Sequence, residues 1–346
     1  MRDRARWEPW LVGLISIGLT LLTSTLFLLI AGANPWQAFG NILSGAFESP
    51  KKLADIAVAG VPLLLCSAGM LVTFAAGLWN IGVEGQMIAG ALLTTWLVRS
   101  VTAPSAVVLP LSALAGLVGG ALWGLLTGLI RTYGRVNEIF AGLGLNFVAQ
   151  ALTSYLVFGP WKPPDRATMS GTDPFPREAW MPLLGTSRSS LVTLLVAVAA
   201  LVAVFVLLRN TYWGLRLKAI GLNTQSAQRL GVRTGRVMLS AFVVCGALAG
   251  LAGSFQATAV YQRLIPQISG GYGYLSQLVV LLSGLRAQWV PAVVFFFAAM
   301  QVGSPRLELR MQLDSSLGGI LQTSMVLFFL LARGVHQRWR AKAAKE

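Results

Sequence analysis

Long apolar runs, separated by short polar or basic connections, dominate the chain. A helix needs roughly 20 apolar residues to cross the hydrocarbon core of a bilayer. Because lipid offers the backbone no hydrogen-bond partner, such segments are predicted to be helical. The predicted fold is all-α: a polytopic membrane helix bundle of about ten transmembrane helices with two pseudo-repeated halves, forming a single domain over residues 1–346. The expected spans cover residues 10–31, 54–77, 81–98, 105–130, 138–159, 189–208, 237–258, 268–285, 288–303 and 316–333.

Composition supports a membrane protein. Of 346 residues, 55% are hydrophobic and only 11% are charged, whereas soluble domains carry roughly 25% charged residues. Most of the outer surface is therefore expected to contact membrane lipid. The net charge of +15 comes from basic residues in the connections, so it is attributed to topology, and no nucleic-acid partner is expected.

The distribution of basic residues also predicts an orientation. Ten spans place both termini on one side, and the connections on that side hold 17 Lys and Arg residues against 10 on the other. Cytoplasmic connections carry the excess of positive charge. A multi-pass protein of the bacterial cytoplasmic (inner) membrane with both termini in the cytoplasm is expected.

The cytoplasmic connection over residues 209–236 holds six basic residues and no acidic one. Within it, Asn223 is a good N-cap and Gly231 supplies a left-handed helix end, which predicts a short helix between them. Isolated helices of this length are marginal in water, so a partner is expected to hold it. Lipid headgroups and a docked cytoplasmic subunit both fit.

On the other side, the connection over residues 159–188 contains six prolines. Proline at this density excludes a regular helix. A rigid external cap, a landing surface for a soluble partner and a plain connection all remain open.

Two short segments broken by glycine hold the polar residues expected at membrane depth. The first contains Asn80, Glu84 and Gln86, and the second, over residues 269–277, contains Tyr274 and Gln277. Paired broken segments in the two halves of a transporter indicate a substrate site near the membrane midplane. We therefore predict a pathway near these residues. For Glu84 there is a rival structural role, in which it accepts hydrogen bonds from backbone N–H groups freed by the break at Gly82 and Gly85.

Other polar residues at membrane depth are few. The amide of Asn146 needs a buried partner or lines the pathway. Four glycines at every fourth position of the fourth span, from Gly116 to Gly128, predict close helix packing. The sequence contains no phosphate-binding G-x-x-x-x-G-K-[ST] loop, no catalytic set and no metal-ligand cluster, so no enzyme activity is expected.

Three motifs resemble the permease subunits of bacterial ABC importers, and most closely the nucleoside permeases within the broad group of sugar and branched-chain amino-acid permeases. The resemblance extends from about residue 55 to residue 333. Its motifs are Asn80-Ile-Gly-Val-Glu-Gly-Gln86 with Gly90-Ala91, Asn137-Glu-Ile with Leu145-Asn146, and Gly221-x-Asn223…Ala227…Gly231 with Ala247-Leu-Ala-Gly250.

The resemblance implies a permease paired with a second, different permease chain, cytoplasmic ATPase subunits that bind ATP and Mg²⁺, and an extracytoplasmic substrate-binding protein. No cofactor is expected in this chain. A simple sugar or a branched-chain amino acid is an alternative substrate, and a gradient-driven carrier using Glu84 is an alternative mechanism. By resemblance, the segment around Gly221, Asn223, Ala227, Arg229 and Gly231 couples to the ATPase. The expected pathway residues are Asn80, Glu84, Gln86, Asn146, Tyr274 and Gln277.

Overall fold

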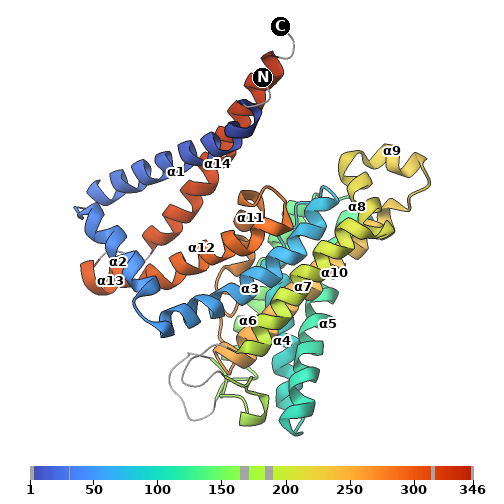
Figure 1. The fold of residues 1–346 in the computed structure, drawn as a ribbon. Coiled ribbons are helices and arrows are strands. Elements are labelled where there is room, and N and C mark those ends of the chain that lie inside the picture. Colours follow the sequence, from blue (N-terminus) through green and yellow to red (C-terminus); the bar gives the residue numbers. More distant parts are fainter. Residues whose placement is uncertain (1–3, 31, 164–170, 184–189, 313–315, 344–346) are drawn as a thin grey trace.

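The structure is a computed structural model that describes residues 4–30, 32–163, 171–183, 190–312 and 316–343 (Figure 1). Within these ranges all regular structure is helical. In chain order the elements are α1 (Arg4–Ile30), α2 (Pro35–Phe47), α3 (Pro50–Ala75), α4 (Val83–Ser100), α5 (Ser105–Thr132), α6 (Glu138–Phe158), the 3₁₀ turn η1 (Arg177–Ala179), α7 (Leu191–Asn210), α8 (Tyr212–Leu222), α9 (Thr224–Arg229), α10 (Thr234–Phe255), the π-helical turn η2 (Gln256–Val260), α11 (Tyr272–Leu282), the 3₁₀ turn η3 (Ala287–Trp289), α12 (Val290–Gly303), α13 (Pro305–Met311) and α14 (Ser316–Ala343).

A helix is found at each of the ten expected spans, but the described residues do not confirm ten spans. Six helical segments are long and apolar enough to cross a membrane, and a seventh if α1 and α2 are taken as one bent span. Helix α4 is not among them, because Glu84, Gln86 and Arg99 lower its mean hydropathy. Helix α11 is not among them either, because it has only 11 residues after the glycine turn that precedes it.

The first apolar run was expected to form one span over residues 10–31, and the structure adds a second helix, α2, directly after it. The axes of α1 and α2 differ by 112°. Asn34 caps α2 by accepting a hydrogen bond from the Trp36 N–H, and Pro35 occupies the first helical position. Pro35 cannot supply an N–H to continue α1, so the chain turns here.

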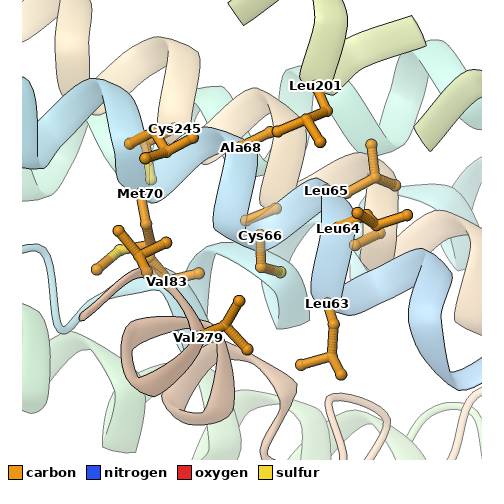
Figure 2. Packing of buried hydrophobic residues seen from close by; sticks show 14 of the residues in the cluster. Leu63, Leu64, Leu65, Cys66, Ala68, Met70, Val83, Leu201, Cys245 and Val279 are labelled. Atoms are coloured by element: carbon orange, nitrogen blue, oxygen red, sulfur yellow. The ribbon is translucent and has the colours of Figure 1, made fainter. Parts of the chain in front are cut away.

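Helix α3 lies at the centre of the bundle, in contact with α7, α10, α11 and α12 (Figure 1). Of its most apolar 18-residue stretch, 89% is buried inside the protein, compared with 22% for α7. Figure 2 shows its side chains, among them Leu63, Cys66 and Met70, packed against residues of other helices such as Leu201 and Val279. Helix α3 is therefore the core of the bundle, whereas α7 lies at its surface.

The predicted close packing of the glycine stripe is confirmed between α5 and α10. A methyl group added at Gly120 would lie 2.6 Å from the Cα atom of Gly250. One turn away, the Ser254 hydroxyl donates to the backbone oxygen of Ser112 at 2.9 Å. The two backbones touch because neither helix has a side chain at the crossing.

Candidate functional site

The two glycine-broken segments lie against each other. Gly270 and Gly271 adopt left-handed backbone conformations, with φ of 54° and 75°, in the turn that leads into α11. The carboxylate of Glu84, on the first turn of α4, accepts hydrogen bonds from the N–H groups of Gly271 at 3.1 Å and Gly273 at 2.8 Å. Glu84 thus satisfies backbone donors that a helix start leaves without intrahelical partners.

The structural role expected for Glu84 is therefore correct in kind but wrong in location. We expected donors from the break at Gly82 and Gly85, within its own segment. Instead, Gly85 donates its N–H to the side-chain oxygen of Asn146 at 2.8 Å. The Glu84 side chain contacts the other broken segment, where a methyl group at Gly273 would lie 2.7 Å from the Cα atom of Glu84.

Asn146 joins three elements. Besides accepting from Gly85 of α4, its amide nitrogen donates to the Ile81 carbonyl at 2.9 Å and to the Tyr274 hydroxyl of α11 at 3.1 Å. Asn146 is 4% exposed, so these bonds satisfy an amide that would otherwise be buried without partners. Interhelical bonding, one of its two expected roles, is therefore observed.

Asn80 and Gln86 form a separate hydrogen-bonded pair. Their side-chain amides exchange hydrogen bonds of 3.2 Å and 3.3 Å, and Asn80 also donates to the Cys245 sulfur at 3.2 Å. Both side chains are fully buried. In this structure they brace the α3–α4 connection against α10.

A groove of about 310 Å³ opens beside Glu84, Asn146 and Tyr274. We call it the polar groove. It also contains residues that sequence reasoning missed: Phe147, Gln150, Gln267, Ser269 and the glycines of the turn. Gln150 lies four residues after Asn146 and so shares its helix face, a signal that was available in the sequence.

Three of the six expected pathway residues do not line the polar groove. Asn80 and Gln86 are fully buried outside its lining, and Gln277 lies further along α11, partly buried. The amide nitrogen of Gln277 has no hydrogen-bond partner within the described part of the chain.

The described part of the proline-rich connection packs on the segment that leads to the glycine turn. Thr172 donates its N–H to the Leu264 carbonyl at 2.9 Å, and Phe175 donates to the Gln262 carbonyl at 2.7 Å. Residues 164–170 and 184–189 of this expected external loop lie outside the described residues. Backbone hydrogen bonds thus hold the described residues 171–183 against the segment before the glycine turn.

The expected short helix in the basic connection is present as α9. Asn223 caps it by accepting from the Ser226 N–H at 2.9 Å, and Gly231 follows its end with φ of 83°. Ala227 is buried and Arg229 is exposed. Helix α8, which the sequence did not predict, precedes α9. Gly221, near the end of α8, packs on Gly77, which lies between α3 and α4. A methyl group added at Gly77 would lie 3.2 Å from the Cα atom of Gly221.

Within the described ranges, no three His, Cys, Asp or Glu side chains gather as they would to hold a metal ion. The polar groove offers a carboxylate that is already hydrogen-bonded, side-chain amides, hydroxyls and an aromatic face. Such groups suit reversible binding of a polar, uncharged molecule better than covalent chemistry.

Known proteins resemble this chain along nearly its whole length. The glucose ABC transporter permease protein TsgB13 of Haloferax volcanii is 31% identical, over 98% of this chain and 91% of its own. The nucleoside ABC transporter permease protein NupB of Lactococcus lactis subsp. cremoris is 26% identical over 85% of this chain and 84% of its own. The guanosine ABC transporter permease protein NupP of Bacillus subtilis is 24% identical over 93% of each chain.

A family model described as branched-chain amino acid transport system / permease component matches residues 52–331. This range contains the polar groove, α9 and every residue assigned to either. The chain therefore belongs to this family and is the integral membrane permease subunit of an ABC importer.

Proposed function

We propose that this permease forms one half of a pathway for nucleosides, and that the polar groove contributes to that pathway. The observation that carries the proposal is the meeting of the two glycine-broken segments at Glu84 and Asn146 beside an open polar groove. Its volume of about 310 Å³ lies at the lower end of the usual range for small-molecule sites, roughly 300–1,000 Å³.

The lining chemistry supports a nucleoside. The Tyr274 and Phe147 rings, 41% and 67% exposed, offer aromatic faces to a base, while amides such as Gln150 suit a hydroxyl-rich sugar. Stacking on a base contributes about 1–3 kcal/mol, which is enough to select a substrate without trapping it. The names of two relatives, for nucleosides and for guanosine, point the same way.

A simple sugar is the second candidate, because the relative with 31% identity is named for glucose. Uptake of radiolabelled nucleoside and glucose by cells expressing the complete importer separates the two. Under our proposal, unlabelled nucleoside competes and glucose does not. Tyr274→Ala should raise the KM for nucleoside uptake about 5- to 150-fold, and the exposed control Tyr133→Ala should not. Saturable glucose uptake that is indifferent to Tyr274→Ala would favour the sugar and contradict the assigned pathway.

We also propose that α9 and its flanking residues, from Gly221 to Gly231, dock on the ATPase that binds ATP and Mg²⁺ for this importer. Docking explains why a helix of six residues is capped at both ends on an exposed connection. A second, different permease chain and an extracytoplasmic binding protein complete the proposed assembly. Membership of a permease family argues against the gradient-driven carrier that the sequence left open. That carrier would use Glu84, whose carboxylate already accepts hydrogen bonds from two backbone donors.

The proposed orientation places residues 209–236 and both termini in the cytoplasm, and residues 159–188 outside. Cysteine labelling tests it cleanly, because Cys66 and Cys245 are fully buried. An impermeant maleimide should label Glu178→Cys in intact cells and Gln228→Cys only after permeabilisation. The reverse pattern would invert the topology.

For the transmembrane count, we propose ten spans formed by α1, α3, α4, α5, α6, α7, α10, α11, α12 and α14, in two pseudo-repeated halves. The contact between α4 and α11, which start at corresponding broken segments, supports this arrangement. Short or polar helices are tolerated at these positions because protein surrounds them.

A further inference from the structure

A second groove, of about 500 Å³, lies where α3, α7, α8 and the turn after α11 meet. Its apolar wall includes Leu71 and Phe74 from the end of α3, and Phe205 and Leu208 from the last turns of α7. We call it the basic groove because of the charges at its rim. It lies apart from the polar groove and shares no lining residue with it.

Three cations line the rim: Arg209 at the end of α7, Lys218 on α8 and Arg286 after α11. All three are exposed, the lining contains no acidic residue, and none of them forms an ion pair with another described residue. The guanidinium of Arg209 stands over the Phe205 ring, 5.7 Å from its centroid. An anion entering the groove would therefore meet cations that no carboxylate of the described chain neutralises.

The position of the groove relates it to the bilayer. Helix α7 is the most apolar span, with mean hydropathy 3.2, and it ends at the basic residue Arg209 and Asn210. Phe205 and Leu208 thus belong to the hydrocarbon side of this end, and Arg209 and Lys218 to the polar side. The groove crosses the boundary between acyl chains and headgroups.

We propose that the basic groove binds an anionic glycerophospholipid, with the phosphate held by Arg209, Lys218 and Arg286 and an acyl chain lying against Phe205 and Leu208. Basic pockets between transmembrane helices on the cytoplasmic side are suited to acidic lipid headgroups. A soluble anion would use the cations but leave the apolar wall exposed to water. The cytoplasmic leaflet follows from the orientation proposed above, whereas the lipid class does not depend on it.

The test uses the complete importer in nanodiscs of phosphatidylcholine with a minor fraction of phosphatidylglycerol or cardiolipin, followed by native mass spectrometry of the retained lipids. The pocket triple variant is Arg209→Gln, Lys218→Gln and Arg286→Gln. Its matched control is Arg216→Gln, Arg233→Gln and Arg236→Gln, which removes three exposed cations from the connection that holds Arg209 and Lys218 but none that lines the groove. Both variants change surface charge equally.

The wild type should retain anionic lipid in preference to phosphatidylcholine, and millimolar inorganic phosphate should not displace it. Each cation near a membrane surface raises the affinity for an anionic lipid about fivefold. The pocket triple variant should therefore weaken lipid retention on the order of a hundredfold, and the control should not. Equal losses in both variants would show only diffuse attraction, and displacement by phosphate would show a soluble-anion site. Unchanged lipid with loss of the ATPase from the pocket triple would assign the groove to that subunit. Each of these results overturns the proposal, as would a wild type without lipid preference.

Discussion

The N–H of Gly273 donates to Oε2 of Glu84 at 2.8 Å, so the carboxylate of one broken segment holds the first turn of the helix that follows the other. Only glycine permits this approach, because a side chain at Gly273 would collide with the backbone of Glu84. The bond joins α4 to α11 next to the polar groove, and movement between these helices must break it. Glu84 is thus a positioning residue for the groove.

We predict that Glu84→Gln destabilises the folded permease by about 2 kcal/mol, and that Glu84→Ala costs more. Hydrogen bonds to a charged acceptor contribute about 1.5–3 kcal/mol each, and alanine leaves the part-buried N–H of Gly271 and the buried N–H of Gly273 without this acceptor. The measurement is the unfolding midpoint and yield of purified complex. Glu308→Gln, at an exposed position on α13, is the matched control and should behave as wild type. A fully stable Glu84→Gln protein that no longer transports would instead assign the carboxylate to the substrate.

In the connection over residues 209–236, local signals in the sequence predicted α9 but not α8. The caps of α9 at Asn223 and Gly231 depend on neighbouring residues only, so residue type and spacing were sufficient. The same kind of signal stood at Asn34-Pro35, where a capping residue precedes proline, and it was overlooked inside a long apolar run. Apolar length alone does not distinguish one straight span from two helices joined at 112°.

Pairings across the bundle could not be predicted in the same way. The N–H donors that bond to Glu84 are 187 and 189 residues away in the sequence. Packing of the whole bundle decides which helices meet and at which register. Sequence brought Glu84, Asn146 and Tyr274 into one candidate set, and the structure places all three at the polar groove. The sequence could not separate these three residues from Asn80 and Gln86, because the exposure of a side chain depends on what covers it in the fold.

Substitution by leucine should lower the stability of the protein at Gln86 but not at Gln277. Gln86→Leu removes the partner of a buried Asn80 amide and should cost about 1–3 kcal/mol of stability. Gln277→Leu removes an amide nitrogen that has no partner in the described structure, so stability should be unchanged or higher, while uptake should fall if Gln277 belongs to the pathway. Thermal unfolding and uptake at matched protein levels check both. Normal uptake by Gln277→Leu would remove it from the pathway.

Gly120→Ala should strongly reduce folded protein. The added methyl group collides with backbone atoms of Gly246 and Gly250 in α10, and neither helix can yield without moving its neighbours. Overpacking of this kind costs about 1–3 kcal/mol, or more where backbone is involved. Gly144→Ala is the matched control, since α6 leaves open space there. Alanine is also the better helix former by about 1 kcal/mol, so the control should be as stable as wild type in yield and unfolding midpoint.

The docking role of α9 can be tested without damaging its fold. Ala227 is only 2% exposed, so a bulky charge there would disrupt the helix as well as any interface, whereas Leu230 is 83% exposed. An aspartate at Leu230 should leave the membrane bundle intact but prevent burial of an apolar side chain, which is worth about 1.5–3 kcal/mol. The expected result is uptake reduced about 10- to 100-fold, with ATP hydrolysis no longer stimulated by the loaded binding protein. Leu309→Asp, at an 84% exposed leucine on α13, is the matched control and should preserve coupling. If Leu230→Asp hydrolyses ATP and transports like wild type, α9 is not the docking element, and its caps serve only to order a basic connection on the membrane surface.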